Sequence, residues 1–328
     1  MSETIRNIII IGSGPAALTA AIYNARANLS PLVFAGAKWG GQLMLTTDVE
    51  NYPGFVEGIL GPELMDKFRK QAERFGAEIV NEDVTGVDFG KRPFEIYVGG
   101  PSPQGSGEVF KTKSVIIATG AETNWLGLAN EQKLIGRGIS SCAPCDAFFF
   151  KDKKVVVVGG GDSAMEEALT LTKFATEVTI IHRRDEFRAS KIMLDRAKAN
   201  EKIKWIVNSV VVDVLGKDKV EGAKIKNLAT NEEKEMAIDG VFVAIGHHPV
   251  TDIFKGQLDL DEKGYVKRVE SGKWKVESGL SFKMATSIEG VFVAGDVHDL
   301  HFKQAVTAAG FGCAAALEAE RWLEAQEG

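Results

Sequence analysis

The chain has 328 residues, a length that favours about two domains of ordinary size. Its apolar content of 45% is typical of a globular protein, and its formal net charge of −6 argues against broad binding to nucleic acid or to an anionic membrane. No apolar run approaches the roughly 18 residues that a transmembrane helix needs. We therefore expect neither a nucleic-acid partner nor a membrane span.

Cysteine is sparse, with three residues in the whole chain, and the first residues, MSETIRN, lack the features of a secretory signal. Such usage fits a reducing compartment, so we expect a cytoplasmic protein. In that setting a C-x-x-C pair is more often catalytic or metal-binding than a structural cross-link.

The first predicted unit begins at residue 8 with a run of isoleucines, followed by a glycine turn and an alanine-rich helix. The turn reads Gly12-x-Gly14-x-x-Ala17. The first glycine permits a tight turn, the second lets a pyrophosphate approach the backbone, and the alanine allows close helix packing. Between a strand and a helix, this pattern indicates a dinucleotide site. The next strand ends in VFAG (33–36) without the acid that often binds a ribose, so ribose contacts are expected from elsewhere.

A polar stretch at 99–108 predicts a surface loop, and a short apolar strand then ends near Thr119. Residues 153–184 afterwards repeat the first design, with four valines, the turn Gly159-x-Gly161-x-x-Ala164, a helix and a second strand. The repeat predicts a second dinucleotide site.

The end of this second strand indicates which nicotinamide nucleotide binds. An NAD site usually has an acid there, whereas this chain has His182, Arg183 and Arg184, followed by Arg188. An acid would repel a 2′-phosphate, while guanidinium groups bind it with paired hydrogen bonds. We therefore expect NADPH rather than NADH, with a solvated basic patch as the alternative.

The stretch SSCAPCDAFFF at 140–150 contains Cys142, Cys145 and Asp146. A zinc site would need a second ligand pair, but one further cysteine and five histidines without paired ligand spacing remain, so we expect no metal. A redox pair explains the spacing, because a C-x-x-C loop closes reversibly and exchanges two electrons. Asp146 either exchanges a proton with a thiolate or caps a helix. Residues 148–150 (FFF) are expected to pack in the core.

A last strand ends in Gly295-Asp296 before a long terminal helix, which contains the third cysteine, Cys313, to which we give no chemistry. Asp296 either hydrogen-bonds a flavin ribityl chain or caps the helix. Two dinucleotide sites in one chain indicate a relay between a tightly held flavin and an exchanging nicotinamide.

Seven motifs occur in order along the chain: GSGPAA, GGQLMLTTDVENYPG, CAPCD, GGGDSAMEEA, HRRDEFRASK, AIGHHP and GDVHDLHFKQAVTAAGFGCAAALEAE. In this combination the chain resembles the low-molecular-weight thioredoxin reductases over nearly its full length. The resemblance implies an α/β fold with two Rossmann-like dinucleotide-binding domains, for FAD and NADPH, the second inserted in the first. It places the FAD domain at 1–122 and 246–328, and the NADPH domain with the C-x-x-C at 123–245.

The resemblance also implies the reaction, in which electrons pass from NADPH to FAD, to the Cys142–Cys145 disulfide and to oxidised thioredoxin, with a rotation between domains. It implies a homodimer, and a docking role for Arg137. The implied flavin contacts are Gly12, Gly14, Pro15, Ala16, Gly41, Gln42, Asn51, Thr119, Gly295, Asp296, Lys303, Gln304 and Ala305. The implied NADPH contacts are Gly161, Asp162, Ser163, His182, Arg183, Arg184 and Arg188.

Three features depart from the family pattern. Ala147 replaces the glycine that usually follows the C-x-x-C-D motif, and Lys303 replaces an arginine near the flavin. Lysine keeps the charge but loses the planar fork of hydrogen-bond donors, so a weaker flavin contact is expected. The link at 268–290 looks long and is expected to form an extra hairpin.

Other functions remain open at this point. A flavoprotein reductase of another thioredoxin-like or glutaredoxin-like carrier would share these motifs, although that type commonly carries an additional thioredoxin-like domain. A ferredoxin–NADP reductase of similar architecture lacks the C-x-x-C. A non-catalytic redox-sensing nucleotide-binding protein would not require the cysteine pair, both fingerprints and the arginines together. The sequence does not indicate which cysteine attacks the partner.

Overall fold

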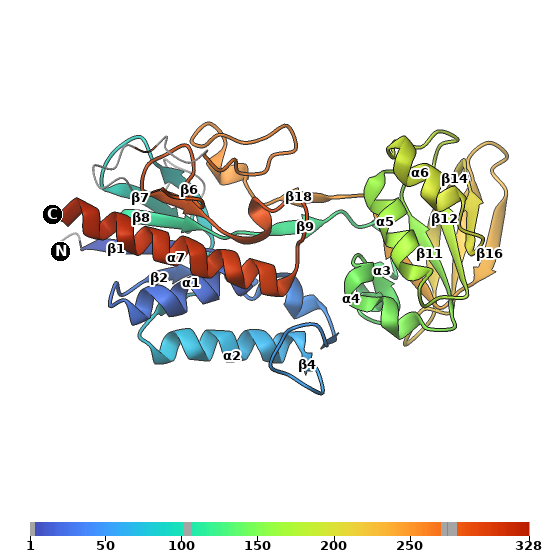
Figure 1. The fold of residues 1–328 in the computed structure, drawn as a ribbon, viewed down its shortest axis with the longest axis horizontal. Helices are drawn as coiled ribbons and strands as arrows, with labels where there is room; N and C mark the ends of the chain where they lie inside the picture. Colours follow the sequence, from blue (N-terminus) through green and yellow to red (C-terminus); the bar gives the residue numbers. More distant parts are fainter. Residues whose placement is uncertain (1–3, 101–106, 270–273, 275–280, 328) are drawn as a thin grey trace. The chain divides into compact units, whose positions relative to one another are not determined.

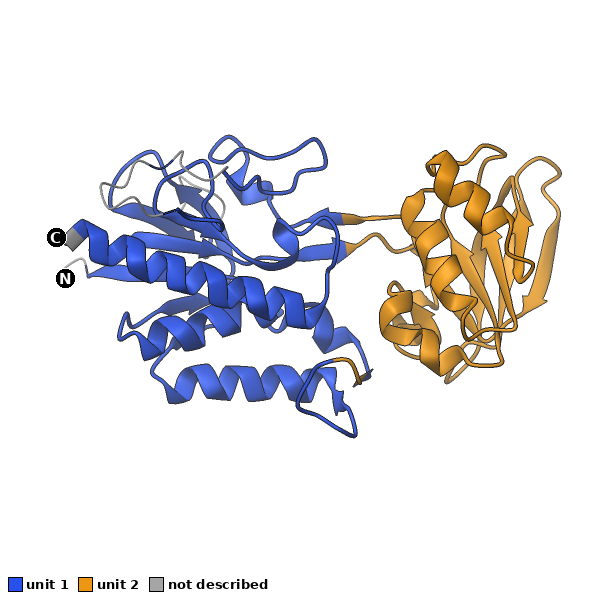
Figure 2. Cartoon of the chain, in the orientation of Figure 1, with its two compact units in different colours: residues 1–48, 52–122, 248–328 blue, residues 49–51, 123–247 orange. Residues whose placement is uncertain are grey.

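The computed structural model describes residues 4–100, 107–269, 274 and 281–327. The chain divides into two compact units, shown in Figure 2. Unit 1 comprises residues 1–48, 52–122 and 248–328, and unit 2 comprises residues 49–51 and 123–247. Six residues of the loop expected at 99–108, and ten residues of the hairpin expected at 268–290, lie outside the described residues.

Unit 1 is built on a seven-stranded sheet with helices α1, α2 and α7. Its helices and strands, with the short strands at its boundary, are β1 (Ile5–Ile11), α1 (Pro15–Arg26), β2 (Leu32–Phe34), η1 (Gly41–Leu45), β3 (Asp48–Val49), β4 (Ile59–Leu60), α2 (Gly61–Arg74), β5 (Glu78–Val80), β6 (Val84–Asp88), β7 (Phe94–Val98), β8 (Glu108–Ile117), β9 (Ala121–Thr123), β18 (His247–Pro249), η3 (Asp252–Phe254), β19 (Val291–Val293), η4 (Gly295–Val297) and α7 (Ala305–Glu327).

The large sheet has the strand order β5-β2-β1-β8-β7-β6, and β19 also pairs with β8. Strands β2, β1, β8 and β19 run parallel, as the predicted βαβ opening requires. Both faces of β1 are buried: Ile8 and Ile10 belong to the cluster that includes α1 and α7, and Ile9 and Ile11 belong to the opposite cluster. A strand covered on both faces reads as a continuous apolar run, which explains the isoleucines. Figure 1 shows α1 and α7 side by side.

Unit 2 contains a five-stranded parallel sheet and a three-stranded antiparallel sheet. Its elements are α3 (Glu131–Leu134), β10 (Ile139–Ser140), α4 (Ala143–Asp146), η2 (Ala147–Phe150), β11 (Lys154–Val158), α5 (Asp162–Leu171), β12 (Glu177–Ile181), α6 (Lys191–Lys198), β13 (Ile203–Ile206), β14 (Ser209–Leu215), β15 (Gly222–Asn227), β16 (Glu233–Ala237) and β17 (Gly240–Val243).

The parallel sheet has the order β10-β17-β11-β12-β13. The valines of β11 alternate between two cores: residues 155 and 157 pack with α5, and residues 156 and 158 pack with residues of β14 and β15. The structure thus confirms the second βαβ unit and the α/β fold class.

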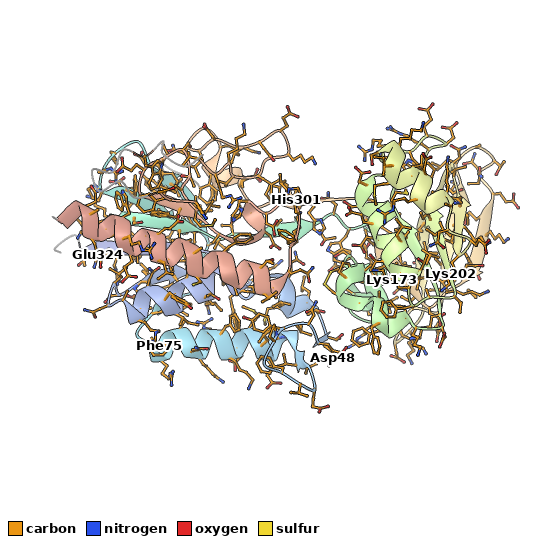
Figure 3. The ribbon with its side chains drawn as sticks, viewed as in Figure 1. Asp48, Phe75, Lys173, Lys202, His301 and Glu324 are labelled. Atoms are coloured by element: carbon orange, nitrogen blue, oxygen red, sulfur yellow. A yellow bond between two sulfur atoms is a disulfide. The ribbon has the colours of Figure 1, made fainter. Side chains whose placement is uncertain are left out.

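At the C-terminal end of α5, the Lys202 Nζ donates hydrogen bonds to the Thr172 and Ala175 carbonyls (Figure 3). A cation there complements the helix dipole.

Within the described residues, no helix is both long and apolar enough to cross a membrane.

Candidate active site

Three parallel strands of unit 1 bring separate parts of the chain to one edge of the sheet. Strand β1 pairs with β8, and β8 pairs with β19. Gly12, Thr119 and Asp296 follow the ends of these three strands. Because ligands of open α/β sheets bind beyond the carboxyl ends of the strands, this edge is the expected flavin site.

The first glycine turn leaves room for a ligand beside Gly14. Gly12 has φ +125°, and a Cβ there would overlap the Ala118 carbonyl group, so only glycine fits. A Cβ on Gly14 would meet no heavy atom of the described chain within 4 Å. Gly41, at φ +68°, lies close by, since its Cβ would be 3.5 Å from the Gly14 Cα. The structure therefore brings these three predicted residues together around an open backbone.

Ser13, which the sequence reasoning did not single out, holds this turn in place. Its buried hydroxyl donates to the Ala35 carbonyl at 2.7 Å and accepts a hydrogen bond from the Gly40 N–H at 2.9 Å. One side chain thus connects the glycine turn, the end of β2 and the turn before Gly41. Its place in the sequence, as a small polar residue between the two fingerprint glycines, is the feature from which this role could have been predicted.

Asp296 presents a buried carboxyl oxygen, Oδ1, that has no hydrogen-bond partner among the described residues. Burial is the main cause that raises the pKa of Asp296 to about 6; the Asp299 carboxylate acts in the same direction and Lys303 in the opposite one. A buried acceptor of this kind is normally satisfied. A hydroxyl donor such as a ribityl chain would satisfy it.

Asp299, also not predicted, shapes the loop before α7. Its carboxylate accepts hydrogen bonds from the His301, Phe302 and Lys303 N–H groups at 2.9, 3.0 and 2.9 Å. Burial alone would raise the pKa of Asp299, but these hydrogen bonds lower it. The Lys303 Nζ lies 5.3 Å from the centre of the Tyr265 ring, which fixes the direction of this side chain.

Two further predicted flavin residues pack closely in unit 1. Gly295 has φ +77°, and its Cβ would lie 2.8 Å from the Ala16 Cβ, so η4 approaches the start of α1 closely. The Gln42 Nε2 donates a hydrogen bond to the Ala121 carbonyl at 3.3 Å. The start of η1 is therefore held near β9, beyond the end of β8.

The remaining predicted flavin residues lie at the ends of strands and helices or in the bends between them. The Thr119 hydroxyl donates to the Val250 carbonyl at 2.6 Å, which joins the end of β8 to the segment after β18. The others are Pro15, which begins α1, Asn51, which lies in the bend between β3 and β4, Gln304, which immediately precedes α7, and Ala305, which begins it.

The second glycine turn, in unit 2, has a similar construction. A Cβ at Gly159 would overlap the Ala244 carbonyl group, whereas a Cβ at Gly161 would meet nothing within 4 Å among the residues that the structure describes. Gly161 is the N-cap of α5, and no described side chain caps this helix end. Exposed Asp162 and Ser163 form the first turn of the helix. The backbone N–H groups at such a terminus favour an anion.

The arginine loop, residues 183–188 after β12, is connected to this glycine turn by hydrogen bonds from the backbone of the loop and of Ser190. The Arg188 N–H donates to the Gly160 carbonyl at 2.8 Å, and the Ser190 N–H donates to Asp162 Oδ1 at 2.7 Å. The structure therefore places the predicted cations beside the predicted pyrophosphate turn. Three arginine side chains of this loop are exposed: Arg183, Arg184 and Arg188.

His182 has a different environment from the arginines that follow it. It is buried, its ring stacks on Phe187 with 4.9 Å between centroids, and its Nε2–H donates to the Glu186 carbonyl at 3.1 Å. Burial lowers the pKa of His182, and the neighbouring arginine charges act in the same direction, while the hydrogen bond to the Glu186 carbonyl opposes them. The imidazole is therefore neutral at pH 7, and it packs against the turn at Gly160.

The two cysteines of the C-x-x-C motif form a disulfide in the first turn of α4. Cys142 is the N-cap, and its carbonyl accepts hydrogen bonds from the N–H groups of Cys145 and Asp146 at 3.2 and 3.1 Å. Cys142 is half-buried and Cys145 is exposed within the single chain. The pair is therefore positioned by a short helical turn at the surface of unit 2.

Ser140 and Glu167, neither given a role from the sequence, both contact this turn. The buried Ser140 hydroxyl accepts a hydrogen bond from the Cys142 N–H at 3.0 Å and donates to the Asp146 carboxyl. The Ala143 N–H donates to Glu167 Oε2. Burial raises the pKa of Asp146, although the bond from Ser140 acts in the opposite direction. Glu167 belongs to the motif GGGDSAMEEA, but nothing in that motif indicates which element it contacts.

The phenylalanines after the disulfide correct one expectation. Phe150 is buried as predicted, but Phe148 is 60% exposed and Phe149 is 37% exposed. The short 3-10 helix η2 turns these two rings away from the core. Ala147 is buried with φ −57° and ψ −31°, an ordinary helical conformation, so the backbone does not require the glycine of related sequences.

The chain is similar to known proteins over most of its length. The pattern of the pyridine nucleotide-disulphide oxidoreductase family matches residues 6–312. The chain is 52% identical to thioredoxin reductase of Mycolicibacterium smegmatis over 99% of both chains. It is 51% identical to a bifunctional thioredoxin reductase/thioredoxin of Mycobacterium leprae (strain TN), over 99% of this chain and 68% of that protein. The solved thioredoxin reductase from Giardia duodenalis matches with a TM-score of 0.88 and 42% identity, over 97% of this chain and 98% of that one.

The chain therefore belongs to the pyridine nucleotide-disulphide oxidoreductase family. Within that family its similarity is to thioredoxin reductases, which confirms the resemblance inferred from the motifs and the expected class of enzyme.

Proposed function

We propose that the protein is an NADPH-dependent thioredoxin-disulfide reductase in which electrons pass from NADPH through FAD and the Cys142–Cys145 disulfide to oxidised thioredoxin. The observation that carries the proposal is the disulfide itself. It lies on α4, which packs against α5, the helix that begins at the second glycine turn. The same unit thus contains a redox pair and a nucleotide fingerprint.

The proposal assigns FAD to residues 1–122 and 246–328. The open space beside Gly14, the N-terminus of α1 without a side-chain cap from the described chain, and the unpartnered Asp296 Oδ1 fit a pyrophosphate and a hydroxylated chain. Bound FAD would accept a hydride and pass two electrons to a disulfide. The flavin contacts named from the resemblance are part of this assignment.

The proposal assigns NADPH to residues 123–245. The start of α5, at Gly161 and the two residues that follow it, would contact the pyrophosphate. The exposed arginines of the loop after β12 would bind the 2′-phosphate, because a guanidinium matches phosphate geometry. His182, which is neutral and buried, would position that loop.

We assign to Asp146 the role of acid and base for the cysteine pair. It ends the turn that holds both sulfur atoms, and burial raises its pKa. A carboxyl with a raised pKa retains a proton more readily, and it can transfer that proton to a thiolate when the disulfide opens.

We further propose a cytoplasmic homodimer that reduces thioredoxin and whose domains rotate during turnover. The relative from Mycobacterium leprae is a bifunctional thioredoxin reductase/thioredoxin, which supports thioredoxin as the partner. Exposed Arg137, shortly before β10, is the proposed docking contact. Light scattering tests the dimer, since a mass of one chain contradicts it.

The deciding experiment measures disulfide reduction by the purified flavoprotein with NADPH and a panel of thioredoxins and glutaredoxins. We expect a yellow protein whose turnover depends on thioredoxin, and a preference for glutaredoxin would favour the alternative carrier. Cys142→Ser should abolish turnover and leave the flavin bound. Unchanged turnover in that variant, or a protein unable to bind FAD, contradicts the proposal.

A further inference from the structure

A second carboxyl, besides Asp146, contacts the turn that bears the disulfide. Glu167 lies in the second turn of α5, and its Oε2 accepts a hydrogen bond from the Ala143 N–H. Ala143 directly follows Cys142 and is fully buried. The bond therefore fixes the residue next to one sulfur atom to the helix that begins at the second glycine turn.

The surroundings of Glu167 are apolar. Ala143, Ala164 and Ala168 are completely buried in one cluster, so water solvates this carboxyl poorly. Burial is the main cause that raises the pKa of Glu167 to about 8; the charges of Asp146 and Glu166 act in the same direction, and the hydrogen bond from Ala143 opposes them. Those two carboxyls, from α4 and from its own helix, are the charged groups that act on it. Glu167 is consequently mostly protonated at pH 7.

We propose that Glu167 is a positioning residue for the Cys142–Cys145 pair and that it shares with Asp146 the proton taken up when the disulfide opens. This inference rests on the redox function proposed above. The hydrogen bond to Ala143 supplies the positioning. Asp146 ends the same four-residue helix, α4, so both carboxyls belong to the surroundings of one cysteine pair and can act on one proton.

The proton transfers balance in both directions. NADPH would supply a hydride, of which the two electrons break the S–S bond and the proton goes to water. Two sulfur anions remain, and one of them takes the proton of the carboxyl pair and becomes a thiol. The remaining thiolate attacks the partner disulfide and forms a mixed disulfide, releasing one partner thiolate. The thiol then returns its proton to the carboxyl pair and attacks the mixed disulfide. The Cys142–Cys145 bond forms again, and the two partner sulfurs take protons from water.

The variant Glu167→Gln separates the two roles. The glutamine carbonyl still accepts the Ala143 hydrogen bond, but the amide has no exchangeable acid proton. Glu166→Gln is the matched control, because it makes the same change at the adjacent, exposed position. Melting temperature and flavin content show whether each variant folds.

The experiment measures thioredoxin reduction, with NADPH, against pH. In the wild type we expect turnover to fall as the pH rises through about 8, where Glu167 ionises. Glu167→Gln should lose this inflection, and its kcat at pH 7 should fall by roughly 10-fold, less than a general acid usually contributes. Glu166→Gln should keep the inflection, displaced to a slightly lower pH because one of the charges that raise the pKa of Glu167 is lost.

Identical pH profiles for Glu167→Gln and Glu166→Gln overturn the inference, provided that Cys142→Ser is inactive. Turnover in Cys142→Ser would instead reject the proposed function. The infrared carbonyl band of a protonated carboxyl in the folded wild type at pH 7, lost when the pH is raised by about 2, is a readout that needs no variant. Absence of that band also overturns the inference.

Discussion

Gly160 lies directly against the imidazole of His182. A Cβ added at Gly160 would overlap the ring, with Nε2 only 2.6 Å away. The ring cannot withdraw easily, because it stacks on Phe187 and bonds the Glu186 carbonyl. The middle glycine of the second turn thus accommodates the residue at the end of β12, which positions the arginine loop.

Gly160→Ala should destabilise unit 2 by about 1–3 kcal/mol, because overpacking displaces a fixed ring. Thermal unfolding measures the loss. The control is Gly161→Ala, where a Cβ meets nothing within 4 Å in the described part of the chain, and its melting temperature should stay near that of the wild type although NADPH binding weakens. Equal melting temperatures for both variants would contradict the packing argument.

Gly312→Ala and Gly310→Ala should have opposite effects on the stability of unit 1: the first should lower it and the second should raise it. A Cβ at Gly312 would overlap the Ala16 carbonyl group, so α7 must move away from α1. At exposed Gly310 it meets no described atom within 4 Å, and alanine should stabilise the helix by about 0.5–1 kcal/mol. Thermal unfolding of the two variants provides the comparison. A stabilised Gly312→Ala protein would show that the helices are not in close contact.

Replacing Arg183 and Arg184 together with alanine should raise the KM for NADPH far more than that for NADH. Each lost charged hydrogen bond is worth about 1.5–3 kcal/mol, or about 10- to 150-fold. Steady-state kinetics with both nucleotides measure the difference. Lys173→Ala, which removes an exposed cation beyond the other end of α5, is the control. Equal increases for both nucleotides would refute the 2′-phosphate assignment.

Asp296→Asn should change how the stability of the flavin-free protein depends on pH. Raising the pKa from 3.8 to about 6 corresponds to about 3 kcal/mol. Between about pH 4 and 6 the folded state binds more protons than the unfolded state, so this carboxyl makes stability fall as pH rises. Denaturant titrations should show that the variant lacks this fall and is more stable at pH 7, while it binds FAD less tightly. If the difference in unfolding free energy between the wild type and Asp296→Asn were the same at about pH 4 and pH 6, that result would contradict the burial of Asp296.

Several features could be predicted from the amino-acid sequence because they depend on residues that are close together in the chain. The glycine turns at Gly12 and Gly159 follow apolar runs, and their steric requirements are local. The spacing of Cys142 and Cys145 matches a single helical turn, which favours their pairing. In each case the backbone conformation and the chemistry are specified within a few residues.

Other features depend on residues far apart in sequence. Glu167 receives the Ala143 N–H across 24 positions, and no periodicity reveals this pairing. His182 belongs to a basic run, yet tertiary burial makes it neutral. Phe148 looked like a core residue but is exposed, because η2 directs it outward.

The local sequence specifies the two nucleotide turns, the cysteine pair and the expected preference for NADPH, because each of these depends on steric fit or charge within a short segment. Folding alone decided which carboxyls surround the disulfide and what their proton affinities are. Burial and hydrogen bonding between distant segments set those affinities, and neither is encoded at a single position.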